Sequence, residues 1–184
     1  MKKKYKFSLK NKRVWVAGHT GMVGSAILKR LKRENCYLLT VDQSKLDLTD
    51  QNKTKNWIKK NKPEVVFIAA ARVGGILANS NNQSDFLYDN LMIQNNVIKL
   101  SSDSNVKKLI FLGSSCIYPK VSEQPINEKQ LMQGPLEETN EGYALAKIAG
   151  LKLCSYLNIE KNKDFISLMP TNLYGPGDNY NLQT

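Results

Sequence analysis

The sequence is poor in histidine, in cysteine and in long apolar runs, and each shortage excludes a class of protein. Its 184 residues include one histidine, His19, which excludes a histidine-rich metal site and any Ser-His-Asp triad built on another histidine. The longest apolar run, Val65 to Ala71, has the length of a buried strand and falls short of the roughly 18 residues of a membrane span. We therefore expect no metal site and no membrane partner.

The number and spacing of the cysteines indicate the cellular compartment. Cys36, Cys116 and Cys154 are odd in number and form no CxxC pair, which favours reduced thiols over a disulfide framework. The apolar run from Val14 to Ala17 is too short for the core of a secretory signal. These features predict a cytoplasmic location.

Acidic residues are outnumbered, since 27 Lys and Arg stand against 16 Asp and Glu, a net charge of +11. Seven of the basic side chains lie within residues 1–13, which contain no acid. We interpret residues 1–12 as a basic, solvated N-terminal tail and expect no nucleic-acid partner, although such a tail is also compatible with binding RNA or a membrane surface.

Strand and helix patterns alternate from residue 13 onward. Short apolar runs predict strands at 13–17, 37–41, 65–70, 108–113 and 165–169, and helical patterns cover 22–33, 49–60, 84–100 and 143–157. Residues 118–140 are polar and hold three of the six prolines, which predicts a long surface loop. Strands separated by helices pair in parallel through right-handed crossovers. The predicted fold class is therefore α/β, a doubly wound, Rossmann-like parallel sheet with helices on both faces.

A glycine-rich loop joins the first predicted strand to the first predicted helix. Its sequence is GxxGxxG, made up of Gly18, His19, Thr20, Gly21, Met22, Val23 and Gly24. The first glycine permits a sharp turn, the second lets backbone amides approach a pyrophosphate, and the third lets the helix pack close to the sheet. The loop predicts dinucleotide binding. His19 is expected either to touch phosphate or to be an exposed loop residue.

Acidic residues follow the second predicted strand. Asp42 is placed to bind the ribose hydroxyls of the coenzyme, where its carboxylate favours NAD because it repels a 2′-phosphate. The alternative is that Asp42 only forms a turn before Gln43. Asp47 and Leu48 come next and are expected to contact the adenine.

A YxxxK pair on the predicted helix 143–157 carries the candidate chemistry. Tyr143 and Lys147 share one helical face, and a neighbouring ammonium is expected to lower the pKa of the phenol. Ser114, at the end of the fourth predicted strand, is placed to hold a substrate carbonyl against the tyrosine. A surface helix pair is the alternative, but the three residues in this order after the glycine loop predict hydride transfer.

These motifs resemble the extended short-chain dehydrogenase/reductase family. The segments 69–76, 113–119 and 169–176 are similar to members of that family that act on GDP-sugars, and the resemblance runs from Arg13 to Asn179. It implies NADPH-dependent 3,5-epimerisation and 4-keto reduction of GDP-4-keto-6-deoxy-D-mannose to GDP-L-fucose.

The resemblance also implies roles for individual residues. Ser114 would bind the sugar carbonyl, Tyr143 would donate the proton in reduction, and Lys147 would hold the ribose and tune Tyr143. Cys116 would be the base that deprotonates the carbons beside the ketone once its pKa is lowered, or else a small buried residue. The backbone around Pro170, Asn172 and Leu173 would line the nicotinamide.

Two features depart from the family pattern. NADP is the coenzyme that the resemblance implies. The family usually has basic residues near the glycine loop or the second strand, whereas this chain has Thr20 in the loop and Asp42 at the strand end, which leaves NAD open. The family also has a further substrate domain and a general-acid histidine beyond the last matched block. Residues 13–184 are therefore expected to be an incomplete dinucleotide-binding domain, inactive alone, from a protein that dimerises through the apolar face between Phe86 and Leu100 and takes a GDP-sugar as substrate.

Two other functions stay open. The first is another nucleotide-sugar epimerase or dehydratase of the same family, which Cys116 argues against because dehydratases place their acid and base differently. The second is a non-catalytic dinucleotide-binding module whose basic tail binds nucleic acid. The intact pair of Tyr143 and Lys147 argues against that module.

Overall fold

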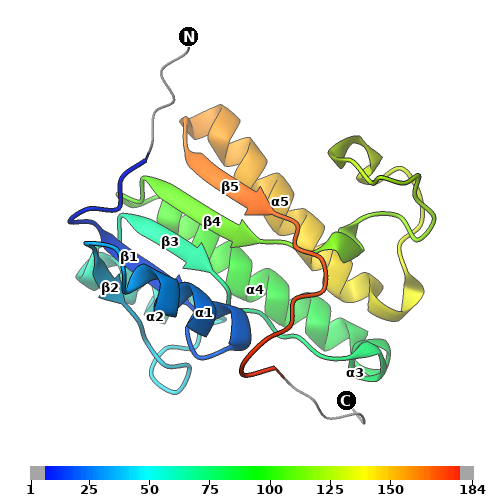
Figure 1. Ribbon diagram of the computed structural model, residues 1–184, viewed down its shortest axis with the longest axis horizontal. Coiled ribbons are helices and arrows are strands. Elements are labelled where there is room, and N and C mark those ends of the chain that lie inside the picture. The colour runs from blue at the N-terminus through cyan, green and yellow to red at the C-terminus, as the bar shows by residue number, and fades with distance from the viewer. Residues whose placement is uncertain (1–6, 179–184) are drawn as a thin grey trace.

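Five parallel strands form the sheet of the computed structural model, which describes residues 7–178 (Figure 1). They are β1 (Arg13–Ala17), β2 (Tyr37–Leu39), β3 (Val65–Ile68), β4 (Lys108–Leu112) and β5 (Asp164–Leu168). Their order across the sheet is β2-β1-β3-β4-β5, and every neighbouring pair is parallel. The predicted doubly wound parallel sheet is confirmed.

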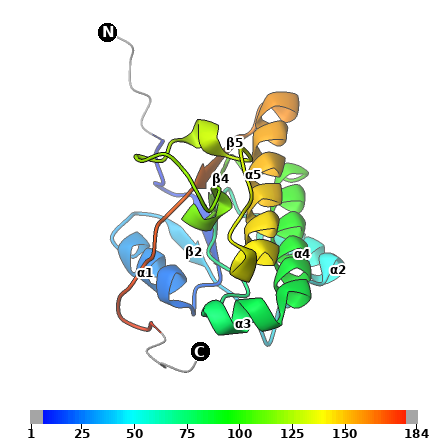
Figure 2. The same ribbon diagram turned by 90° about the vertical axis from the view of Figure 1, so that its right-hand side faces the viewer.

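Helices cover the two faces of the sheet unequally (Figure 2). The helices are α1 (Met22–Leu31), α2 (Gln51–Asn61), α3 (Ile76–Asn81), α4 (Gln83–Ser102) and α5 (Glu141–Lys161). Helix α1 packs on one face, where it buries Val14 and Val16 of β1. Helices α2, α4 and α5 pack on the other face, against Trp15 and Ala17. The alternation of side chains along β1 thus divides the core into two layers.

The uncovered part of the α1 face lies over β5. Ile166 and Leu168 are 40% and 46% exposed there. On the opposite face Phe165 is buried beneath α5. One face of β5 is therefore apolar and open to solvent within the described residues.

Each predicted strand and helix occurs in the structure, with ends that differ by up to four residues, as in α5, which was predicted over 143–157. The predicted strands 37–41 and 65–70 end two residues early, because the chain leaves the sheet at the carboxyl ends of β2 and β3 to form loops. Helix α3 was not predicted, since its six residues have no apolar period. Short 3-10 turns at Ser115–Ile117, Glu128–Gln130 and Glu138–Asn140 lie in segments predicted as a strand end and as a loop.

The predicted basic tail is only partly within the described residues. Residues 1–6 lie outside them. Residues 9–12 are anchored, because the Asn11 amide donates to the Asn35 carbonyl (2.7 Å) and the Tyr37 amide donates to the Lys12 carbonyl (2.8 Å). Lys12 also pairs with Glu64 at 3.7 Å. The last residues of the segment interpreted as a solvated tail are therefore attached to the fold.

Helix α4 uses much of its apolar side within the chain. Phe86, Val97 and Ile98 are buried. Val97 and Ile98 belong to the core that α4 forms with α5 and the sheet. Across residues 7–178, no helix combines the length and the apolar character that crossing a membrane requires. All three cysteines are free thiols, as expected.

Candidate coenzyme cleft and catalytic cluster

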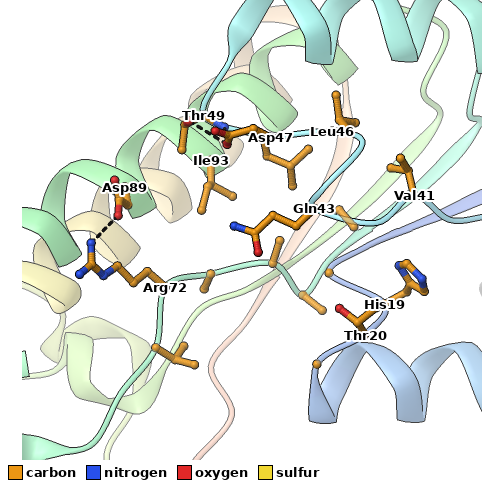
Figure 3. Close-up of a pocket in the computed structure, with 18 of the residues that line it drawn as sticks. His19, Thr20, Val41, Gln43, Leu46, Asp47, Thr49, Arg72, Asp89 and Ile93 are labelled. Carbon is orange, nitrogen blue, oxygen red and sulfur yellow. Dashed lines mark hydrogen bonds and ion pairs between the residues drawn. The ribbon is translucent and has the colours of Figure 1, made fainter. Parts of the chain in front are cut away.

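A cleft of about 640 Å³ opens at the carboxyl ends of β1 and β3 (Figure 3). Between these two strands the order of the strands across the sheet reverses. Such a point is where open α/β sheets bind ligands. Arg72 and Asp89 lie at one end of the cleft, His19 and Thr20 at the other, and Gln43 between them. The loops after β1, β2 and β3 supply most of the walls, with Ile93 and Asp89 added from α4.

Two of the three glycines of the loop, Gly18 and Gly24, make close backbone contacts. Gly18 has φ +82°, and a Cβ there would lie 2.5 Å from the Ala70 amide nitrogen. A Cβ on Gly24 would lie 2.0 Å from the Gly18 carbonyl oxygen. Only glycine allows these two approaches. Gly21 differs, because its Cβ would meet nothing closer than 3.6 Å.

The start of α1 is suited to an anion. Gly21 occupies the cap position, no side chain caps the helix, and its first turn contains no acidic residue. The backbone amides of the first turn, which includes Met22 and Val23, therefore remain available together with the partial positive charge of the helix. The residues present fit the pyrophosphate of a dinucleotide.

Asp42 faces His19. The Nε2 atom of His19 lies 3.5 Å from Oδ1 of Asp42, whose side chain is 52% exposed and does not line the cleft. The Asp42 carbonyl accepts from the amides of Lys45 and Leu46 at 3.0 Å each, so the turn-forming role is present. Binding of ribose by Asp42 stays a prediction. His19 lines the cleft with a side chain only 15% exposed, so the alternative of an exposed loop residue is wrong.

Asp47 and Leu48, the predicted adenine contacts, both line the cleft. Oδ1 of Asp47 accepts from the amide and the hydroxyl of Thr49, at 2.9 and 2.8 Å. Asn96 of α4 is buried and donates to the carbonyls of Leu48 (2.8 Å) and Thr49 (3.0 Å). The helix thus fixes this wall of the cleft.

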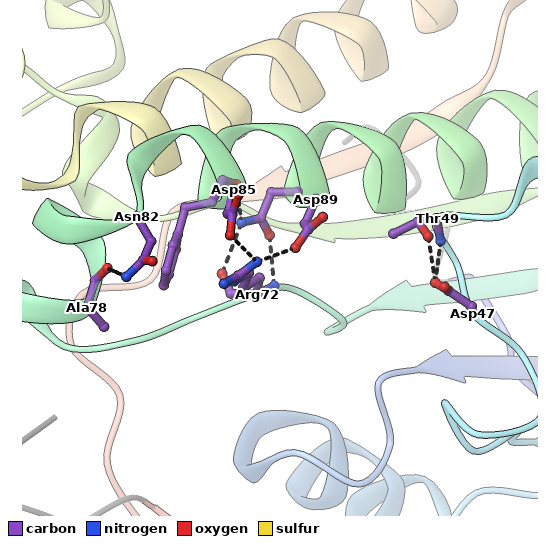
Figure 4. A network of polar contacts seen from close by, with 9 residues as sticks. Asp47, Thr49, Arg72, Ala78, Asn82, Asp85 and Asp89 are labelled. Atoms are coloured by element: carbon purple, nitrogen blue, oxygen red, sulfur yellow. Dashed lines mark hydrogen bonds and ion pairs between the residues drawn. The ribbon is translucent and has the colours of Figure 1, made fainter.

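A second buried asparagine fixes the opposite wall, where Arg72 faces Asp85 and Asp89 (Figure 4). Asn90 accepts from the Arg72 amide (3.0 Å) and donates to the Arg72 carbonyl (2.9 Å). The Arg72 guanidinium donates to Asp89 at 2.7 Å and lies 3.2 Å from Asp85. The hydrogen bond to Asp89, and then the charge of Asp85, raise the pKa of Arg72. Sequence reasoning did not assign a role to Asn90 or Asn96.

The four predicted catalytic residues converge beyond the end of β4. Cys116 Sγ donates to Ser114 Oγ at 3.1 Å, and the Cys116 amide lies 3.4 Å from the same oxygen. Lys147 reaches in from α5 and donates to the Leu112 carbonyl at 2.9 Å. Its Nζ lies 5.4 Å from the centroid of the Tyr143 ring. Ser114, Cys116, Tyr143 and Lys147 therefore form one group, which we call the catalytic cluster.

Burial dominates the protonation of this cluster. It raises the pKa of Tyr143, with a smaller contribution from the charge of Cys116. It also raises the pKa of Cys116, although the hydrogen bond with Ser114 and the charge of Lys147 act in the opposite direction. Burial lowers the pKa of Lys147 to about 8. The expectations that Lys147 lowers the pKa of the phenol and that the thiol pKa is lowered are wrong. At Tyr143 burial and the charge of Cys116 act in the same direction, and at Cys116 desolvation outweighs the charge of Lys147.

The end of β5 and the segment after it are hydrogen-bonded to the backbone on either side of Ser114. The Pro170 carbonyl accepts from the Ser115 amide at 3.0 Å, and the Leu168 carbonyl accepts from Gly113 at 2.7 Å. Asn172 and Leu173 are exposed and do not line the cleft. Their contact with a nicotinamide stays a prediction. Within residues 7–178, no three His, Cys, Asp or Glu side chains are grouped to hold a metal ion.

The model of the NAD dependent epimerase/dehydratase family matches residues 14–184. The chain is 54% identical, over 97% of its length, to a GDP-L-fucose synthase from Sinorhizobium fredii, and it covers 57% of that relative. A GDP-D-glycero-L-gluco-heptose synthase from Campylobacter jejuni, solved in the presence of NADPH, has a TM-score of 0.89 at 41% identity, with 94% of this chain and 51% of that one covered.

A GDP-L-fucose synthetase from Naegleria fowleri bound to NADP is also similar. Its TM-score is 0.85 at 33% identity, and the match covers 96% of this chain and 55% of that one. The chain therefore spans about half the length of the curated relatives it matches.

Proposed function

The chain belongs to the NAD dependent epimerase/dehydratase family, and from this premise we propose that it forms the coenzyme-binding half of an NADP-dependent enzyme. That enzyme epimerises GDP-4-keto-6-deoxy-D-mannose at C3 and C5 and reduces it at C4 to GDP-L-fucose. The relatives named GDP-L-fucose synthase, at 48–54% identity, support this substrate.

The cleft supplies the coenzyme contacts of the proposal. The amides at the start of α1 would hold the pyrophosphate, and Asp47 with Leu48 would contact the adenine. When bound, the coenzyme supplies the hydride for the reduction. The NADP and NADPH forms of the related structures support NADP. The pairing of Asp42 with His19, outside the lining of the cleft, also removes part of the argument for NAD.

Tyr143 is suited to the protonation step of the reduction. Because burial raises the pKa of its phenol, Tyr143 is protonated at neutral pH and can give its proton to the oxygen at C4. The Ser114 hydroxyl would donate a hydrogen bond to the same oxygen. The ammonium of Lys147, 5.4 Å from the ring centroid, would stabilise the phenolate that remains.

The observation that carries the epimerisation is the contact between Cys116 and Ser114. If Ser114 anchors the ketone, the thiol 3.1 Å from its oxygen lies next to the carbons whose protons the ketone makes acidic. The nearby charge of Lys147 favours the thiolate that would remove such a proton, and it acts against burial, which raises the pKa of Cys116 overall. A base beside the carbonyl anchor is what epimerisation requires and a simple reductase lacks.

Solvent deuterium exchange tests this proposal. Residues 13–178 would be fused to the carboxyl-terminal half of the Sinorhizobium fredii relative and incubated with the GDP-keto sugar in D2O. We expect NADPH oxidation and deuterium at C3 and C5 in the parent fusion. Cys116→Ser should lose the deuterium and retain hydride transfer, because serine holds its proton far more tightly.

Cys154→Ser provides the matched control, since Cys154 is buried in α5 within the core. It should exchange as the parent does. Undiminished exchange in Cys116→Ser would remove Cys116 from the mechanism, and a fusion that folds, binds NADPH and leaves this sugar unreduced would contradict the proposed substrate.

The proposal includes a cytoplasmic enzyme and a homodimer. The three free thiols support the location. The homodimer is supported by exposed apolar side chains on the outer helices, which a second copy would cover. They are Tyr88 of α4 (63% exposed) and Tyr156 (54%) and Ile159 (78%) of α5. Sedimentation of the fused protein would test the dimer.

A further inference from the structure

We propose that Gln83, the first residue of α4, is a positioning residue for Tyr143. Its side-chain amide caps the start of α5, the helix that carries the phenol. The meaning of this contact for catalysis rests on the function proposed above, while the contact itself is a feature of the fold.

Helix α5 is not capped by its own residues. Asn140 occupies the cap position but makes no capping hydrogen bond, and its Oδ1 atom is buried without a partner among the described residues. The first four amides of a helix have no partner within the helix, so one must come from elsewhere. An uncapped start would leave the first turn of α5, which includes Tyr143, free to fray.

Gln83 supplies that partner from a different helix. Its Oε1 accepts from the Gly142 amide at 2.9 Å, and its Nε2 donates to the Glu138 carbonyl at 2.7 Å. One side chain thus holds the 3-10 turn Glu138–Asn140 and the first turn of α5 in a fixed relation. Figure 2 shows the start of α5 beside the junction of α3 and α4.

The backbone at this point is equally constrained. Gly142 is buried, and a Cβ there would lie 2.6 Å from the Gln83 carbonyl oxygen. Glycine is therefore needed for the two helix starts to approach. With its amide bonded to Gln83 and its Cα against the backbone of α4, Gly142 sets the position of the next residue, Tyr143. A displacement of a catalytic group by about 1 Å can cost on the order of 100-fold in rate.

The experiment uses the 184-residue chain and measures the phenol directly. Tyrosine labelled with 13C at Cζ reports ionisation by NMR, and Tyr143→Phe identifies the Tyr143 signal. Gln83→Leu keeps the size of the side chain and removes both hydrogen bonds. We expect the pKa of Tyr143 to fall toward the ordinary tyrosine value as the first turn frays, and hydrogen exchange at the Gly142 amide to accelerate at least about 10-fold.

Two further variants make the result specific. Gln83→Glu retains the acceptor for the Gly142 amide, so exchange there should stay within about two-fold of the parent. Gln130→Leu is the matched control, because Gln130 makes the same kind of bridge elsewhere, from the Asn127 amide (2.7 Å) to the Glu123 carbonyl (3.0 Å). Gln130→Leu should change neither the pKa of Tyr143 nor hydrogen exchange at the Gly142 amide. The inference is overturned if Gln83→Leu titrates and exchanges as the parent does, or if Gln130→Leu has the same effect.

Activity separates this inference from the proposed function. In the fused enzyme, Gln83→Leu should lower kcat about 10-fold or more and leave the dissociation constant of NADPH within about two-fold. If Gln83→Leu loses protection of the Gly142 amide while the parent fusion is inactive on the GDP-keto sugar, the role of Gln83 is supported and the proposed substrate is contradicted. If Gln83→Leu keeps normal protection of Gly142 while the parent fusion is active, the substrate is supported and the role of Gln83 is contradicted.

Discussion

The cleft and the catalytic cluster are neighbours in the fold but are built on different principles. The cleft depends on backbone. Gly18 lets its loop approach the loop after β3, Gly24 lets α1 start close to the Gly18 carbonyl, and buried asparagines clamp the walls. The cluster depends on side chains whose protonation burial controls. A cleft of this kind is sensitive to shape, whereas the cluster is sensitive to charge.

This difference predicts two kinds of failure. An added methyl group in the cleft should damage the fold and the coenzyme site together. A substitution in the cluster should leave both intact and remove the chemistry, or change only the pH at which it operates. The following predictions test that separation.

The largest effect is expected at Gly24. Gly24→Ala would place a Cβ 2.0 Å from the Gly18 carbonyl, and we expect it to lower the free energy of unfolding by about 3 kcal/mol, measured with urea, and to abolish NADPH binding. Gly21→Ala is the control. Gly21 has φ −72°, and a Cβ there would make an ordinary contact of 3.6 Å with the Gly18 carbonyl oxygen, so the free energy of unfolding should change by less than about 0.5 kcal/mol. Equal losses in the two variants would contradict this account of the loop.

Tyr143→Phe should have the opposite profile. It removes a proton donor and no packing, so turnover of the fused enzyme should fall by about 100-fold or more while NADPH affinity stays unchanged. Steady-state kinetics and fluorescence titration measure the two quantities. Wild-type turnover in the variant would exclude Tyr143 as the donor.

Lys147 gives a pH dependence of stability. Its pKa falls from 10.5 to about 8 in the folded chain, so between these values the unfolded chain holds a proton that the folded chain lacks. The free energy of unfolding should therefore rise with pH across this window, by up to about 1.4 kcal/mol per pH unit, relative to Lys147→Met.

Only the difference between the two proteins is informative in this experiment. The raised pKa values of Tyr143 and Cys154 lower stability as the pH rises, and they do so in both proteins. Parallel curves for wild type and Lys147→Met between pH 8 and 10 would show that the ammonium is not buried as described.

The smallest effect is expected at Asp42. Its side chain is half exposed and paired with His19, so Asp42→Ser should raise the affinity for NADPH over that for NADH by only about two- to three-fold. Titration with both coenzymes gives the ratio. A change of 100-fold would place the carboxylate on the ribose after all, whereas no change would leave it a turn residue alone.

The backbone features of the molecule could be predicted from the sequence, whereas the protonation of the catalytic cluster could not. Apolar periodicity is local, so it located all five strands, and the glycine spacing reflects backbone geometry that the structure contains. The pKa shifts of Tyr143 and Cys116 were predicted with the wrong sign, because desolvation depends on the packing of α5 against β4, which no local pattern reveals.

The polar clamps were missed for a related reason. Asn90 and Gln94 follow the spacing of the buried face of α4, and polar residues at core positions were the signal that long-range hydrogen bonds occur there. Gln83 offered no such signal. Its partners lie 55 and 59 residues away, so only the folded chain reveals them.

The order of the sites along the chain has a consequence for biosynthesis. All residues that line the cleft lie between Trp15 and Ile93, whereas the catalytic cluster lies between Ser114 and Lys147. The two are consecutive rather than interleaved. On the ribosome, the segment that forms the cleft is translated first, and β1 and β3 can pair while β4 and α5 are still being synthesised. A nascent chain can therefore form the strands and loops that line the cleft before its reactive side chains exist.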